Sequence, residues 1–181
     1  MLEPRRLAAR GSAQRMADTL GELVGQTVGY RMRGETKVSA KTQIEVITEG
    51  ILTRLLQDDP ELPGIGAVIF DEFHERSINS DLGLALCLDV AEVLRDNLYI
   101  LVMAATLDAE PIASMMKAPM VTAEGRSFAV TDVFLEKPRP KNQRFDAAVA
   151  DLVCDAAAET TGGMLVFLPG EGEIRRVEGS L

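Results

Sequence analysis

Short apolar runs alternate with helix-like stretches along most of the chain. Runs rich in β-branched residues and bounded by polar residues predict strands, whereas longer amphipathic or alanine-rich stretches predict helices. The predicted strands are Thr27–Met32, Ile44–Ile47, Ala67–Phe70, Leu98–Met103 and Met120–Ala123. The predicted helices are residues 4–20, Gly50–Leu56 and Asp81–Leu94. This alternation predicts an α/β fold, a mostly parallel sheet with helices on its faces.

Two of these elements carry the strongest apolar signal. Ala67–Phe70 is an uninterrupted apolar run, which is typical of a strand buried on both faces. The helix Asp81–Leu94 is apolar nearly all round, so we expect it to be well covered by the rest of the fold.

The pattern starts afresh near residue 125. A linker-like stretch with two prolines and two lysines, residues 136–142, interrupts it. The elements predicted here are a strand at Phe128–Leu135, a helix at Phe145–Glu159 ended by Gly162 and Gly163, a strand at Met164–Leu168 and a helix from Glu171 to Val177. We therefore expect two α/β units, residues 1–124 and 125–181.

Composition narrows the class of protein. The 181 residues are 46% apolar and 26% charged, enough to bury a core. No apolar run approaches the roughly 18 residues that span a bilayer, and no signal-peptide pattern opens the chain. Cys87 and Cys154 are isolated, and a single histidine cannot complete a zinc cluster. These features predict a cytoplasmic protein without a membrane partner.

The net charge of −9 is unevenly distributed along the chain. Residues 1–54 hold 9 basic and 6 acidic side chains, whereas residues 55–181 hold 10 basic and 22 acidic ones. A local basic strip can bind phosphates even in an acidic protein. The N-terminal third is therefore the candidate nucleic-acid face, with an ordinary solvated surface as the alternative.

Asp71 and Glu72 follow directly on the run Ala67–Phe70. Open α/β sheets bind ligands at the carboxyl ends of their strands. Beside a nucleotide, Asp71 would orient Mg²⁺ through its water shell and Glu72 would accept the proton of the attacking water. Both are thus candidate metal and nucleotide ligands. An acidic pair that simply opens a loop is the alternative.

Two further residues could take part in the same chemistry. His74 is followed by Glu75, but a zinc protease motif needs a second histidine at position 78, which is Ile. The place of His74 after the carboxylates favours a relay role. Thr106 ends the next apolar strand, where its hydroxyl could bond a neighbouring loop or cap a helix that begins after it.

Two helix starts in the basic third carry arginines. Arg5 and Arg6 follow Pro4, and Thr48 opens the helix that carries Arg54. Amide groups at helix N-termini and guanidinium groups both favour anions. One such site would be an ordinary solvated helix end, but two indicate binding of a phosphate backbone.

These segments together resemble the motifs of DEAH-box RNA helicases. Residues 3–10 are similar to motif Ia, Thr48–Arg54 to motif Ib, Asp71–His74 to motif II in its Asp-Glu-Phe-His form, Ala104–Thr106 to motif III and residues 165–174 to motif IV. The order and spacing of these segments agree with those of the family's motifs over nearly the whole chain. The Asp-Glu-Phe-His sequence of motif II and the residues around it resemble a bacterial, HrpB-type branch of the family.

The resemblance implies a RecA-like P-loop NTPase fold, with an incomplete first RecA-like domain at 1–124 and the beginning of a second at 125–181. It implies RNA-stimulated hydrolysis of ATP with Mg²⁺, driving 3′-to-5′ movement along single-stranded RNA. It assigns Asp71 and Glu72 the roles given above and makes His74 and Thr106 couple hydrolysis to domain motion.

Binding residues follow from the same resemblance. Positions that hold the RNA backbone are matched by Arg6, Arg33 and Thr48, with Arg5 and Arg54 as helpers. Arg15 matches an arginine that stacks on the adenine of ATP. Such backbone contacts would be salt-dependent and largely independent of sequence.

The chain also departs from the family. No lysine follows a glycine, so it contains no P-loop, and it carries no counterpart of motifs V and VI. We therefore expect an internal fragment or a mistaken gene start, and no ATP hydrolysis by the isolated chain. Leu98–Met103 should form an unpaired apolar edge that lowers solubility. Ala104 stands where the family usually has serine, so a hydroxyl that could bond motif II is lost. Such a hydrogen bond is worth roughly 0.5–1.5 kcal/mol, and its loss predicts weaker coupling between ATP hydrolysis and unwinding in the parent protein.

Two other readings remain open at this stage. A RecA-like RNA-binding or scaffold module without catalysis would show the same motifs. So would a DNA-directed helicase or an ATP-driven remodeller. The sequence does not identify the protein partners or the physiological nucleic acid.

Overall fold

The computed structural model describes residues 1–105, 109–123, 125, 128–136, 138–139 and 142–181. It divides into two compact units, Met1–Ala123 and Glu124–Leu181. No helix among the described residues is long and apolar enough to cross a membrane.

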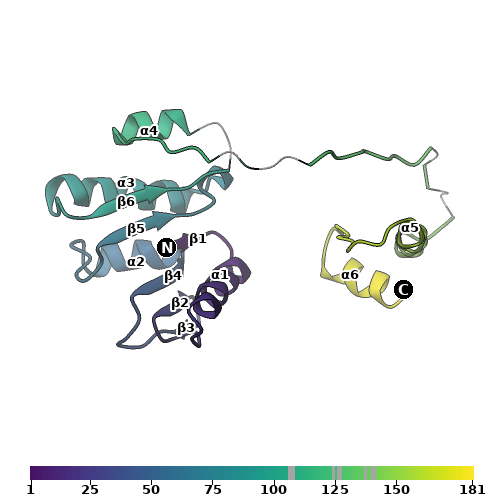
Figure 1. The fold of residues 1–181 in the computed structure, drawn as a ribbon, viewed down its shortest axis with the longest axis horizontal. Coiled ribbons are helices and arrows are strands. Elements are labelled where there is room, and N and C mark those ends of the chain that lie inside the picture. Colours follow the sequence, from purple (N-terminus) through teal and green to yellow (C-terminus); the bar gives the residue numbers. More distant parts are fainter. Residues whose placement is uncertain (106–108, 124, 126–127, 137, 140–141) are drawn as a thin grey trace. The chain divides into compact units, whose positions relative to one another are not determined.

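The first unit is built on a six-stranded sheet (Figure 1). The strands lie in the order β3-β2-β4-β1-β5-β6, and all neighbours are parallel except the antiparallel pair β2 and β3. Their bounds are β1 Leu2–Glu3, β2 Val28–Met32, β3 Glu35–Lys37, β4 Ile44–Thr48, β5 Ala67–Phe70 and β6 Tyr99–Val102. The mostly parallel α/β sheet expected from the sequence is confirmed.

Helices follow the strands along the chain of this unit. They are α1 Arg6–Thr19, α2 Glu49–Asp58, α3 Ile78–Val93 and α4 Glu110–Met116, with the short 3₁₀ helix η1 at Phe73–Glu75. Helix α3 begins three residues earlier than expected because the Ser77 hydroxyl caps it, accepting the Ser80 N–H at 3.0 Å.

The core has two parts, one on each face of the sheet. Ala9, Ala13 and Ala17 form a stripe at helical spacing on α1 that packs on β2 and β4, together with Val46. The next residue, Ile47, belongs to the other cluster, with α2 and α3. Because successive strand residues face opposite ways, α1 covers one face and α2 and α3 cover the other.

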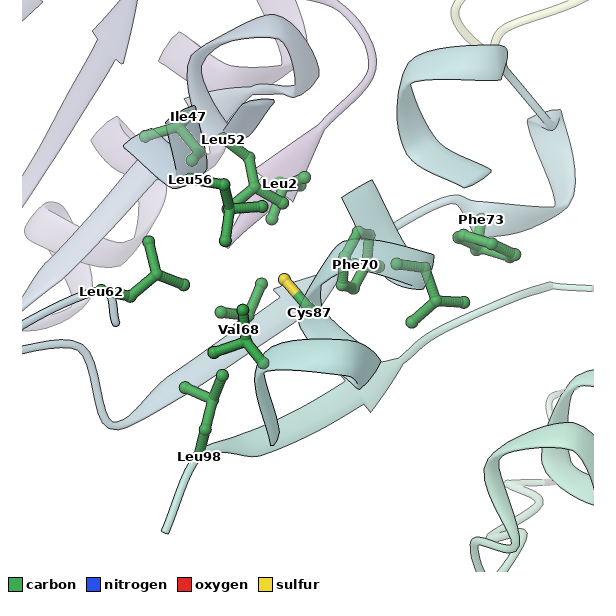
Figure 2. Close-up of a cluster of buried hydrophobic side chains, with 12 residues drawn as sticks. Leu2, Ile47, Leu52, Leu56, Leu62, Val68, Phe70, Phe73, Cys87 and Leu98 are labelled. Carbon is green, nitrogen blue, oxygen red and sulfur yellow. The ribbon is translucent and has the colours of Figure 1, made fainter. Parts of the chain in front are cut away.

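The cluster beneath α2 and α3 is the larger one. Figure 2 shows Phe70 and Cys87 in the middle of this group of buried side chains. Gly83 of α3 allows the close approach, since a Cβ there would lie 3.1 Å from Leu52 Cδ2 and 3.5 Å from the Phe70 ring. Burial raises the pKa of the Cys87 thiol to about 12, so it stays protonated and behaves as an apolar group.

Two expectations about burial are wrong in part. Val68 and Phe70 of β5 are buried, but Ala67 is exposed and Ile69 is only partly covered. The reason is that α3 packs on the face that carries Val68 and Phe70, whereas the face that carries Ala67 and Ile69 is incompletely covered. Helix α3 is likewise buried on one side only, and Ile78, Leu82 and Val93 are exposed.

Strand β6 lies at the end of the sheet and pairs only with β5 among the described residues. Tyr99 and Leu101, on the face away from α3, are 77% and 52% exposed. The expected apolar edge is therefore present.

The second unit holds α5 Phe145–Glu159 and α6 Glu171–Glu178, which pack on each other. The strands predicted at Phe128–Leu135 and Met164–Leu168 are wrong, as is Met120–Ala123 in the first unit. A strand needs a hydrogen-bonded neighbour, and the described part of the second unit contains none. Leu165 and Phe167 accordingly lie 80% and 87% exposed.

Candidate active site and nucleic-acid interface

Asp71 and Glu72 lie at the carboxyl end of β5, beside the ends of β1 and β6. The Asp71 N–H donates to the Leu2 carbonyl at 3.1 Å, which continues the pairing of β5 with β1. The Glu72 N–H donates to Asp71 Oδ1 at 2.9 Å. The carboxylates thus stand at the edge of the parallel sheet where such folds bind ligands.

The backbone turns sharply on either side of η1. Glu72 and Arg76 have φ angles of 50° and 48°, in the left-handed region that costs a side-chain-bearing residue about 1–3 kcal/mol. Phe73 holds the turn in place, because its ring is buried against Phe70 in an edge-to-face contact with centroids 6.0 Å apart. Its N–H also donates to the Met103 carbonyl at 3.0 Å.

His74 connects the carboxylates with the chain that leaves β6. Its Nδ1 accepts the Ala105 N–H at 3.2 Å, and its Nε2 lies 3.4 Å from Glu72 Oε2. Because Nδ1 accepts a hydrogen bond, the neutral ring carries its proton on Nε2, facing Glu72. This contact joins motif II to motif III through the backbone of Ala105.

The two expectations for motif III concern Thr106 and Ala104. Thr106 lies outside the described residues. Its alternative role as a helix cap lies outside the described residues as well, and α4 begins at Glu110 with Ala109 in the N-cap position. The expected effect of Ala104 stays a prediction.

Glu3 is a member of this site that the sequence analysis missed. It is 4% exposed at the end of β1, and its Oε1 accepts the Ser12 hydroxyl at 2.9 Å. Burial raises the pKa of Glu3, the Ser12 hydrogen bond opposes this, and the nearby Asp71 carboxylate raises the pKa further. The only local signal was its position directly before Pro4 and the arginines.

A magnesium ion would find few protein ligands here. The described residues contain no group of three or more His, Cys, Asp or Glu side chains that could hold a metal. Mg²⁺ in nucleotide sites keeps several waters and takes one or two carboxylates together with phosphate oxygens. Asp71, with Glu72 beside it, could supply these one or two carboxylate ligands.

The expected RNA-binding residues gather at the same edge of the sheet. Glu3 pairs with Thr48, so the N-terminus of α1, with Arg5 and Arg6, lies beside the N-terminus of α2. Arg33 is exposed in the turn after β2, which runs parallel to β4. The structure therefore brings Arg5, Arg6, Arg33 and Thr48 to the carboxyl ends of neighbouring strands.

The other two predicted residues lie further from this edge. Arg54 is exposed within α2, past its first turn. Arg15 is exposed on α1, roughly 14 Å along the helix from Arg6 at 1.5 Å per residue. Its role against an adenine stays a prediction.

Glu35 organises the arginines on α1. Its carboxylate accepts the Tyr30 hydroxyl at 2.6 Å and Arg10 at 2.5 Å, and Arg6 lies 3.9 Å away. The Tyr30 and Arg10 hydrogen bonds lower the pKa of Glu35. The carboxylate thereby fixes two arginines that remain 64% and 53% exposed.

Known proteins match this chain over nearly all of its residues. No family model matches the chain. The ATP-dependent RNA helicase HrpB of Escherichia coli K12 is 54% identical over 100% of this chain and 22% of its own length. The ATP-dependent RNA helicase HrpA homolog of Haemophilus influenzae is 34% identical over 96% of this chain and 13% of its own.

Solved structures agree with these sequence matches. A crystal structure of the E. coli DEAH/RHA helicase HrpB superposes with a TM-score of 0.89 over 99% of this chain and 23% of that chain. A second, described as the E. coli DExH-box NTPase HrpB, gives 0.74 over 99% and 22%. This chain thus spans about a fifth of the length of the HrpB proteins and a smaller share, 13%, of the HrpA homolog. By sequence and by its RecA-like α/β fold, it corresponds over its whole length to one segment of the HrpB-type DEAH/RHA helicases.

Proposed function

We propose that the chain supplies the hydrolytic carboxylates and part of the RNA grip of an ATP-dependent RNA helicase that moves 3′ to 5′ on single strands. The observation that carries this proposal is the meeting of Asp71 and Glu72 with Arg5, Arg6 and Thr48 at one edge of a parallel sheet. The proposal is also supported by the similar E. coli protein, which is named an ATP-dependent RNA helicase.

Each side chain takes a distinct part in the proposed reaction. Bound Mg²⁺ would shield the charge of the transferred phosphoryl group. Asp71 would hold the waters around that ion, and Glu72 would accept the proton of the attacking water. His74 accepts a hydrogen bond from the Ala105 amide and faces Glu72. Together with Thr106 it would couple ATP hydrolysis to domain motion.

The remaining assignments concern binding. Arg6, Arg33 and Thr48 would hold the RNA backbone with help from Arg5 and Arg54, and Arg15 would stack on the adenine. We also place residues 1–124 in a first RecA-like domain and 125–181 at the start of a second. The free thiols Cys87 and Cys154 fit a protein of the reducing cytoplasm.

The hydrolysis test uses the full-length natural protein that contains these residues. Glu72→Gln should lower RNA-stimulated ATP turnover by about 10²–10⁴-fold, because the general base is lost, while RNA binding stays intact. The isolated 181-residue chain should not turn over ATP, since it contains no P-loop to hold the phosphates. Turnover by either protein at the unsubstituted rate would contradict the proposal.

A binding test separates the alternatives. The full-length protein should bind a fluorescent single-stranded RNA with an affinity that falls with salt, by a slope of about −0.7 per phosphate contacted. Arg6→Gln should weaken binding and lower this slope by about one contact. RNA binding without any ATP turnover would favour a non-catalytic module, and stimulation of turnover by DNA alone would favour a DNA-directed enzyme.

A further inference from the structure

Both segments that are expected to bind RNA touch the short stretch that follows the carboxylates. Arg5, at the start of α1, pairs through Nη2 with Glu75 Oε1 at 2.8 Å. Glu49, in the first turn of α2, accepts the Ser77 hydroxyl at 2.5 Å. These contacts join residues 70 and 28 positions apart in sequence.

The Arg5–Glu75 pair is open to a competitor. The Arg5 side chain is 73% exposed, whereas Glu75 is 34% exposed. An RNA phosphate that approached the start of α1 would meet a guanidinium already shared with a carboxylate. Phosphate oxygens accept from guanidinium groups in the same bidentate geometry as carboxylates, so the two ligands compete for Arg5.

Glu75 is linked in turn to the proposed general base. Its N–H donates to the Glu72 carbonyl at 2.9 Å, which closes η1, and the Arg76 N–H donates to the Phe73 carbonyl at 3.2 Å. The residues on either side of η1, Glu72 and Arg76, both have positive φ angles, which are unfavourable for residues with a Cβ. Such a conformation persists only where surrounding contacts enforce it, and the pair with Arg5 is one of these contacts.

We propose that Glu75 is a positioning residue that competes with RNA for Arg5, so that RNA binding releases η1 and thereby changes the setting of Glu72. This rests on the proposed function, because it assumes that RNA reaches the N-terminus of α1. It adds a path from RNA to the hydrolytic carboxylate that runs within the first unit. The path is separate from the contact of His74 with motif III.

RNA affinity tests the competition. In the full-length natural protein without nucleotide, Glu75→Gln keeps the shape of the side chain and removes its charge. It should tighten binding of a fluorescent single-stranded RNA about two- to fivefold at low salt, as expected for loss of an exposed ion pair. The matched control is Glu92→Gln, the same change at an exposed site near the far end of α3, which should alter affinity much less.

A double-mutant cycle shows whether Arg5 carries the effect. Arg5→Gln should weaken RNA binding, and Glu75→Gln should give no further gain in that background. An equal gain with and without Arg5 would show that only long-range charge matters, and would overturn the inference. Failure of the unsubstituted protein to bind RNA would instead overturn the proposed function and this inference with it.

Amide hydrogen exchange tests the release of η1. RNA should speed exchange of the Glu75 and Arg76 amides several-fold in the unsubstituted protein. In Glu75→Gln these amides should exchange fast already and should respond little to RNA. A structural role alone would give no dependence on RNA, so unchanged exchange in a protein that binds RNA would contradict the inference.

Discussion

Glu72 carries both the proposed chemistry and a φ angle of 50°. Glycine adopts this conformation without the steric cost of a Cβ, so Glu72→Gly should be about 1 kcal/mol more stable than Glu72→Gln, although both variants lose ATP turnover. Urea denaturation of the two full-length variants measures the difference. Equal or lower stability of the glycine variant would show that the surrounding structure relaxes around this residue.

Glu35 makes stability depend on pH. The hydroxyl of Tyr30 and the guanidinium of Arg10 lower its pKa, so its contribution is present above the usual carboxyl range and is lost as the pH falls through the lowered pKa. The unsubstituted protein should therefore lose more stability than Glu35→Gln between neutral pH and about pH 3. Urea midpoints at both pH values test this, with Glu92→Gln as the control. The same loss in all three proteins would contradict the prediction.

Sequence motifs locate the residues whose chemistry is local but miss their partners. The run from Asp71 to His74 lies at the predicted sheet edge, as expected. Glu3, Glu35 and Glu75 gave little local signal of their roles, because these roles come from contacts with side chains elsewhere in the chain, such as Ser12, Arg10 and Arg5. A carboxylate becomes informative only when the fold shows which group it faces.

At the scale of elements, prediction works where an apolar run or period is long enough to detect. Ala67–Phe70 and Phe145–Glu159 have the bounds expected from the sequence. Strand β1 has two residues and η1 has three, too few for a period to appear. The run at Met164–Leu168 has strand composition, but strand pairing is a property of neighbours, which composition does not report.

One arginine fastens the loop between α2 and β5. Arg95 Nη1 donates to the carbonyls of Glu61, Leu62 and Ile65 at 3.1, 2.9 and 2.8 Å. This loop holds Leu62, which is buried with a φ of 47°.

Replacing this arginine should unfasten the loop. Arg95→Met keeps much of the side-chain stem and removes the shared Nη1 donor from the Glu61 and Ile65 carbonyls, while the Leu62 carbonyl keeps only the Ile65 N–H, so the free energy of unfolding should fall by about 1–3 kcal/mol. Lys41→Met, the same loss of charge at an exposed site, should change it by less than about 0.5 kcal/mol. Urea denaturation compares the two variants, and equal effects would show that loss of positive charge alone matters.

At the scale of the whole molecule, the parallel sheet turns separated sequence motifs into one surface. The chain reaches its carboxyl edge at Glu3, Thr48 and Asp71, and parallel pairing of β4, β1 and β5 sets these ends side by side. The sheet predicted from sequence implied this edge, but the strand order that makes Arg5 a neighbour of Glu75 needed the structure. The local excess of basic residues in 1–54 thus has a spatial counterpart beside the acidic pair.

Strand β6 is the last strand of this sheet and pairs only with β5 among the described residues, and its Tyr99 and Leu101 side chains are exposed. Exposed apolar edge strands pair with copies of themselves, so the isolated 181-residue chain should self-associate at micromolar concentration. Leu101→Lys should restore a monomer, because a charge on the edge opposes strand pairing. Leu23→Lys, the same change at an exposed leucine outside the sheet, should not. Sedimentation velocity measures the masses. A monomeric unsubstituted chain with one cooperative unfolding transition would contradict the prediction, and an equal effect of Leu23→Lys would show that general solubility, rather than the edge, controls association.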